Sequence, residues 1–364
     1  MTNSVSIGFE FIKEKALNFV RSCHVPDDSP YAYCMLPGKP ALYMASGNAA
    51  MFFRLFKALD ELSNEEIDNW ALYLNSGQQD DGYIFEPWLT EKDLSSAEIH
   101  SFDHTRSHNS RIAIMGLLAL GMAPRKRLKF VHPFFETKAI RKWLDSSDWK
   151  DVWFVGNEIF DLGLYLGIEW EAFGEERAKK GIDFLLDELV RRQEPETGLW
   201  ATGRNTPIPA MAGAFHLYPI FIQFWREIPY PERIVDFTLA VQDKCEGYCP
   251  HFDAIHILAN MMRMTNHRRP EVEDTMRRFQ SDIILQMRED GGFPPGQSVF
   301  NCYVRQAKAD SPDEAALWCT LFRYLTIGLI ASTIKDDKYA GPWDFRGIFH
   351  SNLYPVNCGM IPLA

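Results

Sequence analysis

Apolar residues recur at every third or fourth position along most of the chain, as they do on one face of an α-helix. The first such stripe consists of Phe9, Ile12, Ala16, Phe19 and Val20. Similar segments lie at 47–61, 64–76, 104–121, 136–145, 152–170, 175–192, 209–226, 231–242, 251–265, 271–288 and 312–334. Because the alternation typical of β-strands is scarce, the pattern predicts an all-α protein with twelve helices.

The predicted helices are of two kinds. Those at 175–192 and 271–288 carry a charged face, whereas those at 152–168, 210–225 and 315–330 are apolar nearly all round. A helix that is apolar on every side has to be buried on every side. Alternation of the two kinds predicts an inner ring of helices inside an outer ring. We therefore expect an (α/α)6 toroid of six helix pairs that forms one domain over residues 1–364.

The connections after three predicted outer helices share a pattern. Each has Gln at the helix end, then acidic residues, then Gly and an aromatic ring, and the three copies lie at 78–83, 193–200 and 286–293. We expect the Gly to take the left-handed C-cap conformation and the ring to pack back over the helix end. The Gln is expected to bond the exposed turn of the neighbouring repeat. Near the C-terminus, the run 343–346 (Trp-Asp-Phe-Arg) is expected to close the ring against the first pair.

The second copy resembles the QW repeat of the terpenoid cyclase and prenyltransferase superfamily. The residues that carry the resemblance are Gly181, Phe184, Leu185, Leu186, Gln193, Gly198 and Trp200. The other copies are degenerate and end in Tyr83 and Phe293, so the similarity touches roughly the middle four-fifths of the chain through short motifs. The resemblance implies the toroid fold and an enzyme of that superfamily. Its catalytic Asp-x-Asp-Asp and Asp-Asp-x-x-Asp motifs are missing here.

Composition and charge narrow the ligand class. The chain of 364 residues has 10 Trp, 13 Tyr and 26 Phe, which suit either a large aromatic core or the lining of a cavity for an apolar or ring-shaped ligand. The net charge of −11 argues against a nucleic-acid partner, because such a surface needs clustered Lys and Arg. The expected partner is a small-molecule or glycan substrate.

The sequence also bears on location. Residues 1–6 are polar and give no signal peptide, and the longest apolar candidate for a transmembrane segment, 317–334, is interrupted by Arg323. The seven cysteines are scattered and odd in number, which fits reduced thiols better than a disulfide framework. We expect a cytoplasmic protein without a transmembrane segment.

Polar residues near the starts of the inner helices are the site candidates, since parallel inner helices gather their N-termini at one mouth. Asp103, His104 and His108 form the first cluster. The two histidines are four residues apart, so they share a helix face and suit a proton relay or a metal. The alternative is that Asp103 caps the helix and the histidines bond to backbone groups.

Two further clusters lie in predicted inner helices. Glu158 and Asp161 interrupt an apolar helix, so they are expected to face a wet cavity or an Arg; Asn157 beside them is a candidate helix cap. The run 248–256 is the densest in reactive side chains, and Pro250 fits the first turn of its helix. Its Asp253 and His256 suit an acid–base pair. The possible ligands of a metal are Cys249, His251, Asp253 and His256, although their spacing is not that of the zinc-dependent prenyltransferases.

The last cluster surrounds the start of the final helix. Ser311 and Pro312 are typical of a capped helix start, which places Asp313 in the first turn. Arg323 within this apolar helix is expected to need a carboxylate or an anionic ligand. The predicted catalytic residues are Asp103, His104, His108, Asp253, His256 and Asp313, and the predicted substrate-binding residues are Glu158, His216, Tyr303, Trp318 and Arg323.

Three functions remain open. The first is a terpenoid-cyclase-like enzyme in which an Asp or His donates a proton in an aromatic cavity, with a substrate that need not be a terpenoid. The second is an (α/α)6 polysaccharide lyase or glycoside hydrolase, for which Asp80, Asp81, Asp103, Tyr303 and Trp88 would suit. The third is a non-catalytic binding scaffold. No cofactor is firmly implied, and a divalent metal is left open.

Overall fold

The computed structural model describes residues 7–94, 101–296, 300 and 303–348. Within these residues the chain forms twelve α-helices and no strand, with only isolated β-bridges in the connections. The helices are α1 (Ile7–Ser22), α2 (Tyr43–Leu55), α3 (Asn64–Ser76), α4 (Phe102–Ala119), α5 (Thr137–Ser146), α6 (Val152–Glu171), α7 (Glu176–Arg192), α8 (Pro207–Gln223), α9 (Pro231–Val241), α10 (Tyr248–Met261), α11 (Arg269–Leu285) and α12 (Leu317–Thr333). Each corresponds to one predicted helix. None of the helices in the described part of the chain is long and apolar enough to cross a membrane.

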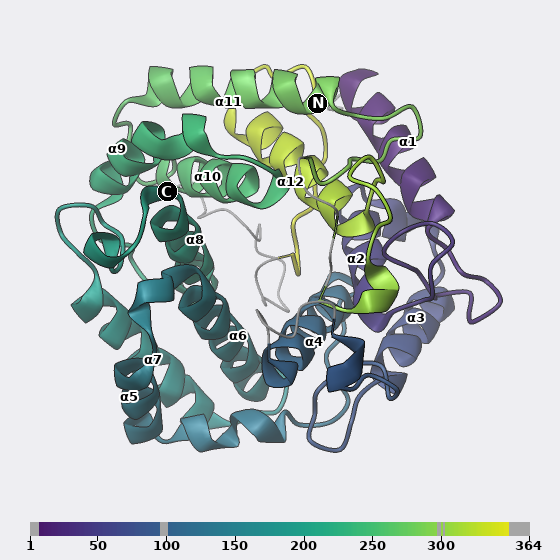
Figure 1. Cartoon of the computed structure of the whole chain (residues 1–364), viewed down its shortest axis with the longest axis horizontal. Coiled ribbons are helices and arrows are strands. Elements are labelled where there is room, and N and C mark those ends of the chain that lie inside the picture. The colour runs from purple at the N-terminus through teal and green to yellow at the C-terminus, as the bar shows by residue number, and fades with distance from the viewer. Residues whose placement is uncertain (1–6, 95–100, 297–299, 301–302, 349–364) are drawn as a thin grey trace.

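Six of the helices follow one another around the centre of the molecule (Figure 1). In chain order α2, α4, α6, α8, α10 and α12 each contact the next, and α12 contacts α2. The other six lie on the outside, where most pack on one or two of these inner helices. The helix α5 differs, because its main contacts are with α7 and with the 3-10 helix Lys129–Phe135.

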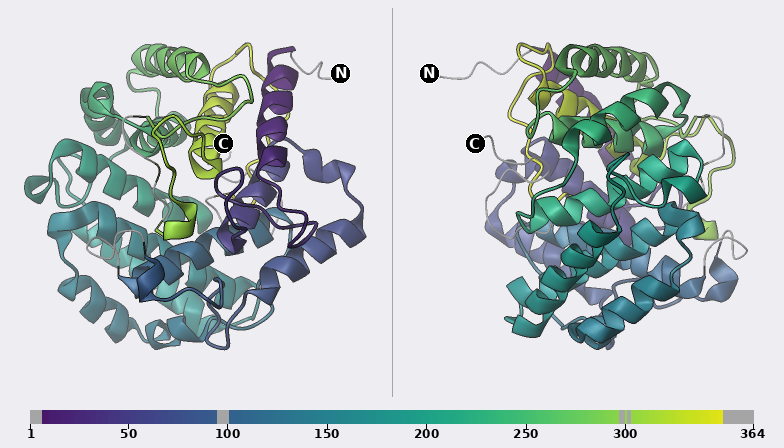
Figure 2. Two further views of the ribbon diagram at one scale, coloured as in Figure 1. Left: turned by 45° about the vertical axis from the view of Figure 1, so that its right-hand side comes forward. Right: turned by 90° about the vertical axis from the view of Figure 1, so that its left-hand side faces the viewer.

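The two ends of the helical sequence meet. Helix α1 packs on both α2 and α12, and Figure 2 shows α1 beside α12 from the side. The segment after α12 completes this contact: the Trp343 ring lies 5.0 Å from the Phe9 ring of α1, and the Asp344 backbone N–H donates to the Leu55 carbonyl of α2 at 3.0 Å. The prediction that 343–346 packs against the first helix pair is therefore confirmed.

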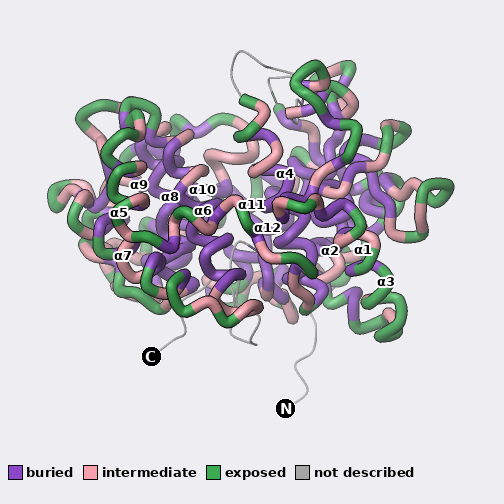
Figure 3. Tube along the Cα trace, turned by 90° about the horizontal axis from the view of Figure 1, so that it is seen from below, coloured by how far each residue is buried: buried purple, intermediate pink, exposed green. Residues whose placement is uncertain are grey.

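Burial separates the inner helices from the outer ones, as the sequence pattern predicts (Figure 3). In α12 every residue from Leu317 to Ala331 is buried, and in α8 the same holds from Ala210 to Gln223. Helix α7 instead buries a single stripe, which includes Ile182, Leu185 and Leu189. Such a stripe is sufficient for a helix that packs on one side only.

Neighbouring inner helices approach closely through glycines. A Cβ atom on Gly116 of α4 would lie 2.4 Å from the Cα atom of Gly47 of α2, and a Cβ on Gly156 of α6 would lie 2.7 Å from the carbonyl oxygen of Gly213 of α8. Further along the first pair, Arg54 Nε donates to the Ala119 carbonyl at 2.6 Å. Because residue numbers increase together along this contact, α2 and α4 run parallel, and their N-termini lie at the same end.

Two of the predicted helices have wrong boundaries. The predicted helix 47–61 begins earlier, at Tyr43, and ends at Leu55. The predicted start of the last helix at Ser311 is also wrong, because α12 begins at Leu317. Local side-chain bonds explain the second error: the Glu314 carboxylate accepts the backbone N–H groups of Asp310 and Ser311, both at 3.0 Å. Such bonds hold a turn in competition with a helix.

The repeated connections behave largely as predicted. Gln193 Nε2 donates to the carbonyls of Gly198 at 2.6 Å and Pro229 at 3.1 Å, so it ties its own turn to the next one. Gln78 does the same with the carbonyls of Gly82 and Lys126. The buried Trp200 ring packs back on α7 and donates from Nε1 to the Leu189 carbonyl at 2.8 Å.

Two details of that prediction need correction. The left-handed glycines Gly82, Gly198 and Gly291 lie within the turns and are not the helix caps, since the caps are Gly77, Gln193 and Gln286. In the third copy the chain reverses with a backbone bond from Arg288 N–H to the Gly292 carbonyl, equivalent to that from Glu194 to Leu199 in the second. Met287 therefore stands where the other copies have the bonding Gln.

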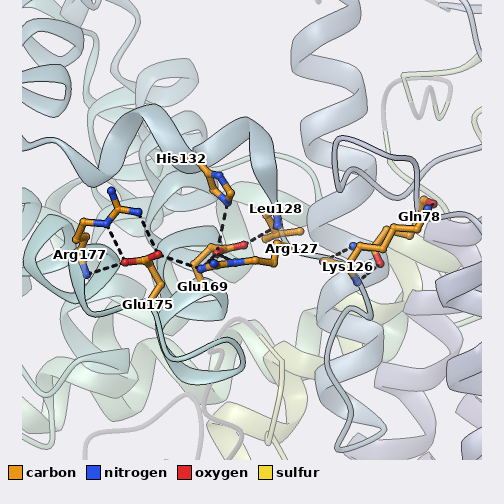
Figure 4. A network of polar contacts seen from close by, with 8 residues as sticks. All are labelled: Gln78, Lys126, Arg127, Leu128, His132, Glu169, Glu175 and Arg177. Atoms are coloured by element: carbon orange, nitrogen blue, oxygen red, sulfur yellow. Dashed lines mark hydrogen bonds and ion pairs between the residues drawn. The ribbon is translucent and has the colours of Figure 1, made fainter.

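A polar network centres on residues 126–128, in the connection between α4 and the 3-10 helix Lys129–Phe135 (Figure 4). On one side the Lys126 backbone N–H donates to Gln78 Oε1 at 2.7 Å. On the other side the buried Glu169 carboxylate accepts from the Leu128 backbone N–H at 2.6 Å and pairs with Arg127 at 2.8 Å. Arg127 continues the network to Glu175 at 3.2 Å. The connection is thus fixed to the helix pair before it and to the pair after it.

Candidate functional site

A cavity of about 370 Å³ lies among the N-terminal halves of five inner helices. This volume is at the small end of the roughly 300–1,000 Å³ range of ligand pockets, and the walls are mostly aromatic. The lining residues are His104, His108 and Arg111 from α4, Trp153, Phe154, Asn157 and Phe160 from α6, Phe215 and His216 from α8, Tyr248, Cys249 and Asp253 from α10, Trp318 and Phe322 from α12, and Asp151, Phe300 and Tyr303 from the connections. The cavity suits one small molecule.

Asp253 is the buried carboxyl group of this cavity. It is 1% exposed, and its Oδ2 atom has no hydrogen-bond partner in the described part of the chain. Helix α10 begins after Gly247 (φ 81°) and carries Pro250 in its first turn, as predicted. Asp253 follows Cys249 by one turn, so both side chains reach the cavity. Burial raises the pKa of the Asp253 carboxyl well above its usual value, because the ionised form loses its hydration there.

His216 is the complementary neutral base. Its Nδ1 atom lies 2.7 Å from the Ala212 carbonyl oxygen, which can only accept a hydrogen bond. Burial, and secondarily the charge of Arg111, lower the pKa of His216 to about 3. The ring is therefore neutral at pH 7, with its proton on Nδ1. The Nε2 atom consequently carries a lone pair that can accept a proton.

Arg111 is the cation of the cavity wall, and it is already paired. Its Nη1 donates to Asp161 Oδ1 at 2.7 Å and its Nη2 donates to Asn157 Oδ1 at 3.2 Å. Ser107 Oγ donates to Asp161 Oδ2 at 2.6 Å. Burial raises the pKa of Asp161, and the Arg111 charge opposes this rise. The expectation that Asp161 faces an Arg is confirmed, and Asn157 is a partner of that Arg rather than the cap of α6, which is Asp151.

Aromatic rings enclose the space between these groups. The His108 ring lies 4.3 Å from the Tyr303 ring and 5.4 Å from the Trp318 ring, and Trp318 lies 5.0 Å from Phe322. The His104 ring stacks on Phe154 at 4.4 Å. Ring faces carry partial negative charge, so such walls stabilise a positive charge on a bound molecule.

Of the predicted catalytic and substrate-binding residues, six line the same cavity: His104, His108, His216, Asp253, Tyr303 and Trp318. Others lie elsewhere. Asp103 is exposed and pairs with Arg106 at 3.1 Å, and the N-cap of α4 is Ser101 rather than Asp103. Asp313 is exposed on the turn before α12, outside the lining of the cavity. Glu158 lines a neighbouring cavity.

Arg323 and His256 lie behind the cavity wall. Arg323 is 2% exposed, and its partners are neutral: Nη1 bonds His251 Nδ1 at 2.8 Å and Nη2 donates to Gln286 Oε1 at 3.1 Å. Burial, and then the Arg323 charge, lower the pKa of His251 to about 4, so His251 is a neutral acceptor. Of the two partners expected for Arg323, a carboxylate of the protein is therefore wrong within the described residues, and an anionic ligand stays a prediction. His256 packs between Phe215 and Phe252, at 5.1 and 5.7 Å.

The four possible metal ligands point in different directions. Cys249 and Asp253 line the main cavity, whereas His251 bonds the Cys245 carbonyl and Arg323, and His256 lies among aromatic rings. Within the described residues no three His, Cys, Asp or Glu side chains come together in a way that could hold a metal ion. Burial raises the pKa of the Cys249 thiol. The cysteines of the described part are free, and Cys302 and Cys358 lie outside it.

Sequence reasoning missed Arg111, although a signal was present. His104, His108 and Arg111 lie at positions i, i+4 and i+7, so they share one face of α4. Arg111, at the start of the apolar run 111–120, also needs an anionic partner, and Asp161 in the apolar helix α6 needs a cationic one. Apart from Trp318, the aromatic lining from α6 and α12 carried no separate signal, because those helices are apolar nearly all round.

In comparisons with models of protein families, with curated proteins and with solved structures, none matches this chain. The function is therefore argued from the cavity and its residues.

Proposed function

We propose that this chain is an (α/α)6 toroid related to the terpenoid cyclases, and that its cavity protonates a small, uncharged, unsaturated substrate to isomerise or cyclise it. The observation that carries the proposal is the Asp253 carboxyl, which is buried in an aromatic cavity and whose Oδ2 atom has no hydrogen-bond partner among the residues that the structure describes. Burial favours the protonated form of this carboxyl group, which is the form that a general acid needs in order to give a proton to a bound substrate.

Three features of the fold support the relationship. The inner helices contact one another in a closed order, and the outer helices cover them. Gln193 and Gln78 bond the following turns, as the resemblance to QW repeats implies. The cavity lies at the N-terminal ends of the inner helices. The missing Asp-x-Asp-Asp motif is compatible with a different acid, Asp253.

The residues of the cavity supply both the proton donor and the proton acceptor of the proposed reaction. Asp253 gives its proton to one carbon of a carbon–carbon double bond, and the positive charge forms on the other carbon. The ring faces of Phe215, Trp318 and Phe322 stabilise that charge while ring closure or a shift occurs. His216 Nε2 then takes a proton from a neighbouring carbon and restores a double bond. The substrate gains and loses one proton, and exchange with water returns the enzyme to its starting state.

The charges of the cavity favour an uncharged substrate. Arg111 is its cation, and the buried ion pair with Asp161 at 2.7 Å satisfies that charge. A phosphate or diphosphate group would have to compete with this carboxylate. Short isoprenoid alcohols and hydrocarbons fit the chemistry of the walls and the volume of about 370 Å³.

The test is incorporation of deuterium. The purified protein is incubated in heavy water with a panel of short isoprenoid alcohols and hydrocarbons, and the products are analysed by mass spectrometry. We expect a product with one deuteron on a former double-bond carbon. Asp253→Asn should lower its rate by about 100-fold or more, the usual contribution of a general acid. Asp313→Asn, an exposed carboxyl outside the cavity, is the matched control and should retain the rate. Equal rates in the Asp253 variant and the control would refute the role of Asp253.

The contact between His108 and Tyr303, at 4.3 Å beside Arg111, supports a second candidate function, a lyase acting on an acidic sugar. In such a lyase Tyr303 and His108 would transfer the protons, and Arg111 would bind the carboxylate of the sugar. A two-carboxylate hydrolase is less well supported, because the other carboxyl of the lining, Asp151, caps α6 by accepting from the Phe154 N–H at 3.1 Å. If the protein converts an acidic oligosaccharide into an unsaturated uronide, and Tyr303→Phe abolishes that product, the lyase is favoured. If the protein binds a ligand but converts none, the third function, a non-catalytic binding scaffold, is favoured.

A further inference from the structure

A second cavity, of about 200 Å³, shares the His104 side chain with the main one. It lies between the N-terminal part of α4, the middle of α6 and the segment formed by the 3-10 helix Lys129–Phe135 and α5. The lining residues are Tyr83, Ser101, Asp103, His104, Ser107, Phe130, Val131, Phe134, Trp143, Glu158, Asp161, Leu162 and Tyr165. The proposed proton-transfer reaction does not use this space.

Aromatic rings form much of its wall. The Phe130 ring meets the Tyr165 ring edge to face at 4.9 Å, and Phe134 meets Trp143 in the same way at 5.6 Å. Tyr83 stacks on Phe130 at 3.6 Å. One of these rings already binds a cation of the chain itself, because the Arg106 guanidinium lies 4.4 Å from the centre of the Tyr83 ring. The rings are thus arranged in a way that attracts positive charge.

The charged groups of the lining are all acidic. They are Asp103, Glu158 and Asp161, and no Lys or Arg of the described residues belongs to the lining. Two of the carboxylates have cations of the protein beside them, since Asp161 pairs with Arg111 and Asp103 with Arg106. Glu158 is partly buried and makes no ion pair within the described residues. It is therefore the carboxyl that is left to meet a ligand.

We propose that this second cavity binds a small organic cation, an alkylammonium group that lies against the rings and pairs with Glu158. An anion would meet three carboxyl groups, and an uncharged apolar ligand would leave the Glu158 carboxyl buried against it without a partner. A bare metal ion is a poor fit, because most of the wall offers carbon atoms instead of oxygen ligands.

The acidity of Glu158 agrees with this assignment. Burial, and secondarily the neighbouring Asp161 carboxylate, raise the pKa of Glu158 to about 7. A carboxyl group in such surroundings is destabilised when it ionises without a counter-ion. A bound ammonium group supplies that counter-ion.

The experiment is titration calorimetry of the full chain at pH 8 with tetramethylammonium and with choline. The neutral isostere of choline, 3,3-dimethylbutan-1-ol, serves as the uncharged probe. We expect one site for the cations and at least tenfold weaker binding of the neutral probe. Glu158→Gln and Trp143→Leu should each weaken cation binding at least tenfold, whereas Glu136→Gln, an exposed carboxyl outside the lining, should change it less than twofold.

Several results would overturn the proposal. They are no binding of either cation, equal binding of choline and its neutral isostere, and unchanged binding in the Glu158 variant. The comparison of the two probes on the unmodified protein does not depend on a variant that folds. The outcome is separate from the proposed reaction, because Asp253→Asn leaves this cavity intact and Glu158→Gln leaves Asp253 in place.

Discussion

The ion pair between Arg111 and Asp161 joins the two cavities, and its removal has a calculable cost. The two side chains are 3% and 7% exposed and their atoms approach to 2.7 Å. At this distance the gross attraction is about 6 kcal/mol for an effective dielectric constant of about 20. Arg111→Met removes the cation and leaves a buried carboxyl that still accepts from Ser107 at 2.6 Å. Loss of one partner from a buried pair typically lowers the free energy of unfolding by about 3–5 kcal/mol.

The double variant Arg111→Met/Asp161→Leu distinguishes the pair from the packing of its side chains. It removes both charges, so we expect most of the lost stability to return, because apolar replacement of a complete buried pair is often neutral. The assay is urea unfolding followed by circular dichroism at pH 7. A loss below about 1 kcal/mol in the single variant, or a double variant no more stable than the single one, would refute the reasoning.

The single variant should also respond to pH in one direction. Without Arg111, the folded-state pKa of Asp161 rises further above its unfolded value, because burial already raises it and Arg111 is the group that lowers it. The folded state then binds a proton that the unfolded state releases at neutral pH. The deficit of Arg111→Met relative to the unmodified protein should therefore shrink as the pH falls from 7 toward the unfolded pKa near 4. A deficit independent of pH would show that the lost charge is not its cause.

Further predictions concern stability. Gly116→Ala should destabilise the chain by about 1–3 kcal/mol or more, since its Cβ would lie 2.4 Å from the Gly47 Cα, whereas Gly203→Ala, with no atom within 4 Å, should be nearly neutral; urea unfolding compares them. Glu158 has a folded pKa of about 7, above its ordinary 4.5, so its ionisation costs stability as the pH rises through that window. Glu158→Gln should remove this loss and stabilise the chain by up to about 3 kcal/mol at pH 8 but not at pH 4, as measured by unfolding at both pH values. Asp253→Leu should raise the melting temperature while activity is lost, because it removes a buried carboxyl oxygen that has no partner; a lower melting temperature would contradict this.

The helices could be predicted from the sequence because their signal is local. The spacing of apolar residues identified all twelve, and the contrast between α7 and α8 identified which lie inside. The start of α12 could not be predicted in this way. Ser311 and Pro312 look like a helix start, but the Glu314 side chain closes a turn there instead. Competition between a cap and a turn depends on side-chain geometry that spacing does not reveal.

The site was predicted only in part, for a related reason. The position of Asp253 near the start of an inner helix was sufficient to select it as a candidate. The partner of Asp161 is 50 residues away in Arg111, and that of Arg323 is 72 residues away in His251. Which buried charge meets which partner depends on how the helices are rotated against one another. For Arg323 the carboxylate that was one of the two expected partners is replaced by His251 and Gln286, and the other expected partner, an anionic ligand, stays a prediction.

The protonation state of Asp253 is the central claim, and infrared difference spectroscopy tests it most directly. Spectra of the unmodified protein and of Asp253→Asn are recorded at pH 7, and their difference isolates the vibrations of this carboxyl group. The account predicts the C=O stretching band of a protonated carboxylic acid, since burial holds the pKa of Asp253 well above its usual value. The symmetric and antisymmetric bands of a carboxylate in that difference would contradict it, and Asp253 could not then be the proton donor.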